Sequence, residues 1–209
     1  MDPRWQTPFT CLVAGPSGAG KTVFVTKFIR FLKEMTHPPP EEVVWCYGEW
    51  QEGYRETENV IFQEGLPNED QWTDGKSRLL IIDDLMAETD HSVTRLFTKG
   101  SHHRNISVML IVQNLFFKNK ESRTISLNSH YMVLFKNPRD ASQITQLAKQ
   151  MYPGKTRWMQ EAYKDATSRP FGYLLVDLRQ STPEHLRLRS HIFPDEQPQE
   201  VYLERCLRN

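Results

Sequence analysis

Three features are scarce or absent in this sequence of 209 residues: cysteine, long apolar runs and a signal peptide. The three cysteines, Cys11, Cys46 and Cys206, lie too far apart for the paired spacing of a zinc site. No apolar run approaches the 18 residues or so of a transmembrane helix, and the first residues lack a signal-peptide pattern. We therefore expect an intracellular, soluble protein that does not enter a membrane.

The sequence also lacks an excess of positive charge. Lysine and arginine number 26, aspartate and glutamate number 26, and the formal net charge is zero. A protein that coats nucleic acid over a large surface normally carries a basic excess, so that class is excluded. Any contact with nucleic acid has to come from a few loops. A hydrophobic content of 38% suffices for one core, and we expect one domain over 1–193 and a polar C-terminal tail over 194–209.

Short apolar runs alternate with amphipathic stretches along the chain. The runs that predict buried strands are Phe9–Ala14, Val43–Tyr47, Leu79–Asp83, Val108–Val112 and Tyr131–Phe135. Further strands are expected near Val60–Phe62, at a sheet edge, and at Phe171–Leu178 and Leu186–Ile192, which are candidates for pairing. Helices are expected from Thr22 to the prolines at 38–40, and at Asp90–Lys99, Ala141–Met151 and Thr156–Thr167. This alternation predicts an α/β fold with a mostly parallel sheet that is covered on both faces.

The strongest motif follows the first apolar run. It matches G-x-x-x-x-G-K-[ST] in full over Gly15, Pro16, Ser17, Gly18, Ala19, Gly20, Lys21 and Thr22. The motif lies between a predicted strand and a predicted helix, which is the context that a phosphate-binding loop requires. Backbone N–H groups and the helix N-terminus would hold the phosphates, Lys21 would reach the β- and γ-phosphates, and Thr22 would bind Mg²⁺. The pattern therefore predicts binding of ATP with Mg²⁺.

Two carboxylates end the third buried run. Leu79–Ile82 is apolar and is followed by Asp83 and Asp84, a Walker B pattern. An unpaired aspartate inside a core strand is costly, so we expect both carboxylates at the carboxyl end of the strand, near the phosphate loop. Asp83 would hold Mg²⁺ through a water molecule. Asp84 is the candidate to polarise the attacking water, a task that related ATPases more often give to glutamate.

A side-chain amide ends the fourth buried run. In many P-loop ATPases that perform mechanical work, the strand between the phosphate-loop strand and the Walker B strand ends in such a group. Gln113 would contact the γ-phosphate or the attacking water, and Asn114 is the neighbouring candidate. The alternative is an amide that satisfies loop backbone.

Arginines near these strand ends are candidates for an arginine finger, which would reach the γ-phosphate of ATP bound to a neighbouring subunit. Arg104, just before the amide-ended strand, is the first choice, and Arg123 is the second. The adjacent histidines at 102 and 103 have no spaced partner that would complete a zinc site. The loop from Leu115 to Arg123 contains two phenylalanines, Lys118 and Lys120. Its lysines are candidate contacts to DNA phosphates, and its phenylalanines either cap the core or contact DNA.

The ordered set of motifs resembles a known family. The segment from Ser101 to Asn137, together with the phosphate loop and the double aspartate, is similar to the genome-packaging ATPases of large double-stranded DNA viruses. These are the poxvirus type and its relatives in Polinton transposons, within the FtsK–HerA superfamily. The resemblance covers about Pro8 to Phe193. Relatives often place an arginine before the histidine of the segment that precedes the sensor strand, where this chain has His102, His103 and Arg104.

The resemblance implies a RecA-like fold of the additional-strand class and a motor driven by ATP hydrolysis. Lys21, Thr22, Asp83, Asp84 and Gln113 carry over as phosphate, metal, catalytic and sensor residues. The implied partners are double-stranded DNA, further copies of the chain in a ring of five or six, and a capsid or portal vertex protein. The implied place of action is the site of virus assembly, in the host nucleus or cytoplasm.

Other P-loop roles stay open from the residues alone. A small-molecule kinase would need an acceptor pocket, which the polar stretch from Gly48 to Ser77 could supply. A non-enzymatic adaptor would bind ATP only to set its shape. A GTPase fits less well, because Asn119-Lys-Glu-Ser122 lacks the aspartate that reads guanine.

Overall fold

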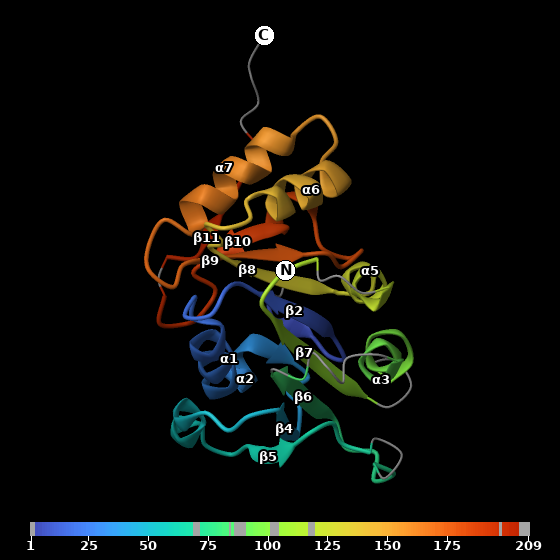
Figure 1. The fold of residues 1–209 in the computed structure, drawn as a ribbon. Helices are drawn as coiled ribbons and strands as arrows, with labels where there is room; N and C mark the ends of the chain where they lie inside the picture. Colours follow the sequence, from blue (N-terminus) through green and yellow to red (C-terminus); the bar gives the residue numbers. More distant parts are fainter. Residues whose placement is uncertain are drawn as a thin grey trace.

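A single large sheet forms the centre of the computed structural model, which describes residues 3–68, 72–83, 85, 91–100, 105–116, 120–196 and 198–204 (Figure 1). The strands are β1 (Trp5–Gln6), β2 (Thr10–Ala14), β3 (Thr36–His37), β4 (Glu42–Tyr47), β5 (Ile61–Glu64), β6 (Arg78–Asp83), β7 (Ile106–Val112), β8 (Tyr131–Phe135), β9 (Tyr173–Asp177), β10 (Leu188–Ser190) and β11 (Glu200–Val201). Among the described residues, nine of these strands form the sheet, in the order β11-β10-β9-β8-β2-β7-β6-β4-β5, and β1 pairs with β3.

The strand directions match the predicted α/β fold. All the pairings from β8 through β2, β7, β6 and β4 to β5 are parallel. Strands β9, β10 and β11 extend the sheet beyond β8 and are antiparallel to their neighbours. The predicted edge strand is confirmed as β5, and the predicted pairing of the two late strands is confirmed as β9 with β10.

The helices lie on both faces of the sheet (Figure 1). They are α1 (Lys21–Arg30), α2 (Leu32–Met35), α3 (His91–Arg95), α5 (Lys120–Leu127), α6 (Ser142–Met151) and α7 (Thr156–Ala166), with short turns η1 (Glu52–Glu56), η3 (Leu96–Gly100) and η4 (Glu184–Leu186). Since side chains alternate along a strand, Cys11 and Val13 of β2 face the core under α1, whereas Leu12 and Ala14 face the core under α3, α6 and α7. No helix in the described part of the chain is long and apolar enough to span a membrane.

Two elements differ from the predicted helices. The first predicted helix is interrupted at Phe31, whose φ of −102° and ψ of 22° are not helical, so α1 and α2 are separate. Helix α5 was not predicted. Its buried residues are Ser122, Ile125 and Ser126, so two of the three buried side chains are small and polar, and no apolar stripe marks the helix.

The C-terminal residues that the structure describes contact the rest of the chain. Strand β11 pairs with β10, where Glu200 stands opposite Ser190. The Lys27 ammonium of α1 lies 2.7 Å from Oε1 of Glu196, and the hydroxyl of Tyr173 donates to Oε2 of the same carboxylate at 2.7 Å. These contacts tie residues near 196 to α1 and β9.

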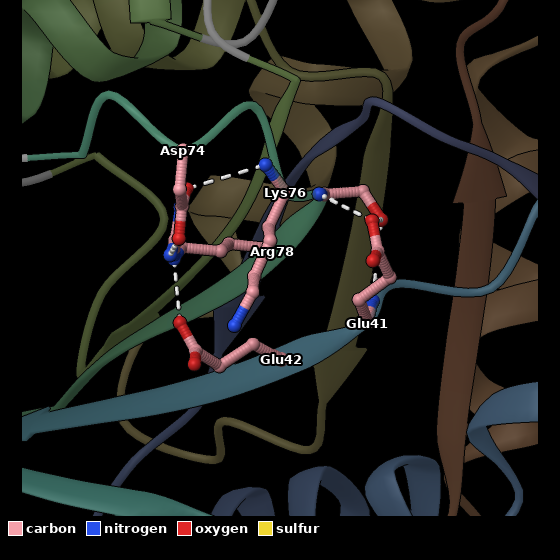
Figure 2. Close-up of polar contacts among 6 residues, drawn as sticks. Glu41, Glu42, Asp74, Lys76 and Arg78 are labelled. Atoms are coloured by element: carbon pink, nitrogen blue, oxygen red, sulfur yellow. Dashed lines mark hydrogen bonds and ion pairs between the residues drawn. The ribbon is translucent and has the colours of Figure 1, made fainter.

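A buried arginine fixes the amino end of β6 (Figure 2). The guanidinium of Arg78 donates to Oε2 of Glu42 at 2.6 Å and to both carboxylate oxygens of Asp74 at 2.8 and 2.6 Å. It also lies over the ring of Trp72, 5.0 Å from its centroid. Because Glu42 begins β4 and stands opposite Arg78, this cluster aligns the two strands at the end of the sheet that is remote from the phosphate loop.

Candidate functional site

The phosphate loop, residues 15–22 and hereafter the P-loop, connects the carboxyl end of β2 to the amino end of α1. Gly18 and Gly20 have φ of 75° and 103°, in the left-handed region that glycine adopts without strain. Gly15 is constrained differently: a Cβ there would lie 2.7 Å from Cβ of Phe135, so only glycine fits. The N–H of Gly15 donates to the carbonyl of Val112 at 3.1 Å, which ties the loop to β7. The loop is therefore anchored to both strands that flank β2.

The Lys21 ammonium lies inside this loop. Its Nζ donates to the carbonyl oxygens of Gly15 at 2.6 Å and of Pro16 at 2.9 Å. The cation is thus held at the centre of the curved backbone, next to the N-terminus of α1, where anions are favoured. Thr22 follows in the first turn of α1 and is partly buried. The residues present fit a bound polyphosphate: a curved backbone, a central cation and an adjacent hydroxyl.

Asp83 lies at the carboxyl end of β6, as predicted. Its side chain is buried, and its Oδ2 accepts a hydrogen bond of 2.9 Å from the hydroxyl of Tyr54. Tyr54 belongs to η1 and is fully buried among the rings of Trp45, Trp50 and Phe62. The sequence did not single out this tyrosine. The signal that could have found it is the pair of aromatic residues, Trp50 and Tyr54, inside an otherwise polar stretch.

The amide-ended strand is confirmed in its place, since β7 lies between β2 and β6. Gln113 follows β7, is exposed, and lines a narrow cleft together with Ala14 and Gly15. Asn114 is held instead by Gln143, whose Nε2 donates to Asn114 Oδ1 at 3.2 Å and whose Oε1 accepts from the N–H of Leu115 at 2.6 Å. Of the two predicted amides, Gln113 is therefore the one that shares a cleft with the P-loop.

The described part of the structure does not place the remaining predicted residues next to the P-loop. Asp84, Arg104 and Lys118 lie outside the described residues, and of Lys120 only the backbone is described. Arg123 is exposed on α5, which covers the sheet face opposite α1. Phe116 is partly buried and packs against the core under α3, α6 and α7, so the core-capping interpretation is confirmed for that residue.

Comparison with known proteins supports the fold. No protein-family model matches the sequence, and no curated protein matches it. The structure is similar to that of the genome packaging NTPase B204 from Sulfolobus turreted icosahedral virus 2, determined in complex with ATPγS. The TM-score is 0.59 at 12% identity, over 99% of this chain and all of that one. A partial similarity to the cytoplasmic domain of EssC has a TM-score of 0.43 at 16% identity, over 64% of this chain and 32% of that one, and does not bear on the fold.

The chain therefore has the α/β fold of a P-loop NTPase, with a mostly parallel sheet between helices and the P-loop at the carboxyl end of β2. The resemblance to viral genome-packaging ATPases, drawn from the motifs, is confirmed at the level of the fold by the similarity to a packaging NTPase.

Proposed function

We propose that this protein is an ATPase that uses hydrolysis of ATP, with Mg²⁺, to move double-stranded DNA during genome packaging. The observation that carries the proposal is the alignment of three strand ends. The P-loop follows β2, Gln113 follows β7 and Asp83 ends β6, and these strands are direct neighbours in one parallel sheet. Parallel strands present their carboxyl ends at one edge, so a single nucleotide could contact all three groups.

The roles of the P-loop residues follow from their charge and position. Backbone N–H groups of residues 18–22 bind phosphate oxygens, and Lys21 neutralises charge on the β- and γ-phosphates. The hydroxyl of Thr22 would bind Mg²⁺ directly, and the carboxylate of Asp83 would hold it through a water molecule, in keeping with the preference of magnesium for oxygen ligands. Held by these two residues, a magnesium ion would supply positive charge that offsets the negative charge developing on the phosphates during hydrolysis.

Hydrolysis also requires a positioned water molecule. Asp84, next to Asp83, is the proposed group that accepts its proton. Gln113 is the proposed sensor, because its exposed amide lines the same cleft as Gly15. Loss of the γ-phosphate would remove a hydrogen-bond partner of this amide. The resulting change in the position of Gln113 would then move the segment that follows β7.

The proposed DNA contact is the segment after Gln113, which carries Lys118 and Lys120. The chain has no excess of positive charge, so the proposal draws its affinity for DNA from a few lysines repeated around a ring of subunits. The arginine finger, Arg104 or Arg123, would complete the active site of the neighbouring subunit in such a ring. The proposed assembly is a ring of five or six copies of the chain, which acts together with a capsid or portal vertex protein.

ATPase rate with and without linear double-stranded DNA, measured together with the mass in solution, tests the proposal. We expect DNA to raise the rate, the mass to be that of an oligomer, and Lys21→Ala to abolish hydrolysis while the fold is retained. A wild-type protein that hydrolyses ATP without any response to DNA would contradict the motor and favour a kinase. One that binds ATP without hydrolysing it would favour an adaptor.

A further inference from the structure

An open cleft of about 330 Å³ lies beside the P-loop, on the side of β8 and β9. Its walls are Gly18 and Ala19 of the P-loop, Lys136 just after β8, and the loop 168–172 between α7 and β9. None of the motifs in the sequence accounts for this loop. The cleft is continuous with the proposed phosphate site, because two of its lining residues belong to the P-loop itself.

Phe171 is the unusual residue of this cleft. This residue is 63% exposed, although burial of a large aromatic ring is strongly favourable. Its φ of 60° lies in the left-handed region, which is a costly conformation for a bulky residue. A Cβ on Gly20 would lie 2.8 Å from Cδ1 of Phe171, so the ring rests against the backbone of the P-loop. An aromatic ring is thus held beside the phosphate site while much of it stays in contact with solvent.

The loop that carries Phe171 is tightly braced. The N–H of Ser168 donates to the carbonyl of Asp165 at 3.0 Å, and the N–H of Gly172 donates to the carbonyl of Arg169 at 3.0 Å. Gly172 accepts no larger residue without movement, since a Cβ there would lie 2.5 Å from the carbonyl oxygen of Ala166. The exposed ring is therefore presented by a fixed loop, which lowers the entropic cost of binding against it.

A second exposed apolar residue lies at the start of α1. Val23 follows the P-loop directly and is 62% exposed. The P-loop is thus flanked by two exposed apolar side chains, one from α1 and one from the braced loop.

We propose that this cleft binds the base and ribose of a nucleoside triphosphate, with the planar base stacked on Phe171. The inference rests on the proposed function for the phosphates and extends it to the rest of the ligand. An aromatic ring stacks on the face of any base and does not read its hydrogen-bonding edge. The site therefore accepts a purine nucleotide through stacking, and ATP and GTP gain from Phe171 to a similar degree.

The test compares nucleotides with a ligand that has phosphates but no base. Calorimetry with ATP, GTP and inorganic tripolyphosphate, each with Mg²⁺, is carried out on wild type and on Phe171→Asn. Asparagine tolerates the left-handed conformation, so this variant removes the ring without adding backbone strain. We expect ATP and GTP to bind on the order of ten-fold to a hundred-fold more weakly to the variant, and tripolyphosphate to bind as it does to wild type.

Matched variants separate stacking from general damage. Phe171→Trp should retain the affinity for ATP. Leu127→Asn removes an exposed apolar side chain from α5, away from the cleft, and should leave the affinities for ATP, GTP and tripolyphosphate unchanged. If Phe171→Asn does not fold by circular dichroism, Phe171→Gly takes its place, because glycine also adopts the left-handed conformation without strain, and the same selective loss is expected. Equal losses for ATP and tripolyphosphate, or no loss for ATP, would overturn the base site. If wild type binds none of the three ligands, the proposed function itself fails.

Discussion

The hydroxyl of Tyr54 donates a hydrogen bond of 2.9 Å to Oδ2 of Asp83, and both side chains are buried. The two residues come from different elements, since Tyr54 lies in the short helix η1 between β4 and β5, and Asp83 ends β6. A buried carboxylate needs donors that fix its position. The aromatic cluster around Tyr54 therefore sets the orientation of the carboxylate that we propose holds Mg²⁺ through a water molecule.

Replacing Tyr54 by phenylalanine should affect both stability and metal dependence. Loss of a donor to a buried carboxylate should lower the free energy of unfolding by about 1–3 kcal/mol. Since Asp83 would then be less well oriented, the Mg²⁺ concentration that gives half-maximal ATPase activity should rise several-fold. Tyr47→Phe removes a hydroxyl from the same aromatic cluster and serves as the control. If Tyr54→Phe changed stability alone and left the Mg²⁺ dependence at the wild-type value, Tyr54 would have no positioning role.

The contrast between Asp83 and Tyr54 shows what the sequence could predict. Asp83 was predicted because a motif of adjacent residues, an apolar run followed by a carboxylate, is legible without the fold. Tyr54 lies 29 residues away from Asp83, and only the parallel pairing of β4 with β6 brings their segments together. The aromatic residues Trp50 and Tyr54 mark their polar stretch as unusual, but no local pattern shows that Tyr54 contacts Asp83, because that contact depends on tertiary structure.

The same distinction holds for the elements of the fold. The buried strands were predicted because continuous apolar runs are typical of parallel strands covered on both faces. Helix α5 was missed because Ser122 and Ser126, small polar residues, occupy two of its buried positions. The exposed Phe171 could not be recognised either, because both its backbone conformation and its contact with Gly20 are set by the folded loop.

The Arg78 cluster predicts a specific dependence of stability on pH. Hydrogen bonds from the Arg78 guanidinium lower the pKa of Asp74 from 3.8 to about 2. A carboxyl group whose pKa is lower in the folded state stabilises the fold above its unfolded pKa and loses that contribution as the pH falls toward its folded pKa. Asp74 should therefore stabilise the protein above about pH 4, with the contribution declining between pH 4 and 2.

Urea unfolding of Asp74→Asn at several pH values measures this contribution. We expect the variant to be less stable than wild type at pH 7, and the difference to shrink as the pH is lowered from 4 to 2.5. Glu52→Gln is the control, because Glu52 and Arg55 form an ion pair that is largely exposed and should contribute little at any pH. A difference for Asp74→Asn that stays constant across this range would show that the ion pair with Arg78 is not its source.

Asp84→Asn should separate binding of ATP from its hydrolysis. If Asp84 accepts the proton of the attacking water, the amide should slow hydrolysis by at least about a hundred-fold, as expected for loss of a general base. Affinity for ATP should stay near that of wild type, because the P-loop supplies the phosphate contacts. Single-turnover hydrolysis and equilibrium binding measure the two quantities. Should Asp83→Asn alone slow hydrolysis, the proton acceptor has to be sought elsewhere.

The last prediction concerns the contact with DNA. In the proposed motor, the segment after Gln113 follows the nucleotide sensor directly, and its lysines bind DNA phosphates. The double variant Lys118→Ala with Lys120→Ala should therefore weaken the stimulation of ATPase activity by double-stranded DNA and leave the basal rate near that of wild type. Each phosphate contact that is lost should lower the dependence of log affinity on log salt concentration by about one unit.

The matched control is Lys149→Ala with Lys164→Ala, which removes two exposed lysines from α6 and α7. It changes the net charge of the protein by the same amount as the variant at 118 and 120. Because both double variants lose two positive charges, a general electrostatic effect would weaken DNA stimulation equally in the two. If the DNA contact lies in this loop, only the variant at 118 and 120 should lose stimulation by DNA. The same variant should also show a smaller dependence of log affinity on log salt concentration. Equal stimulation in both variants and in wild type would mean that this loop does not contact DNA, and the search for the translocating residues would have to move to other parts of the chain.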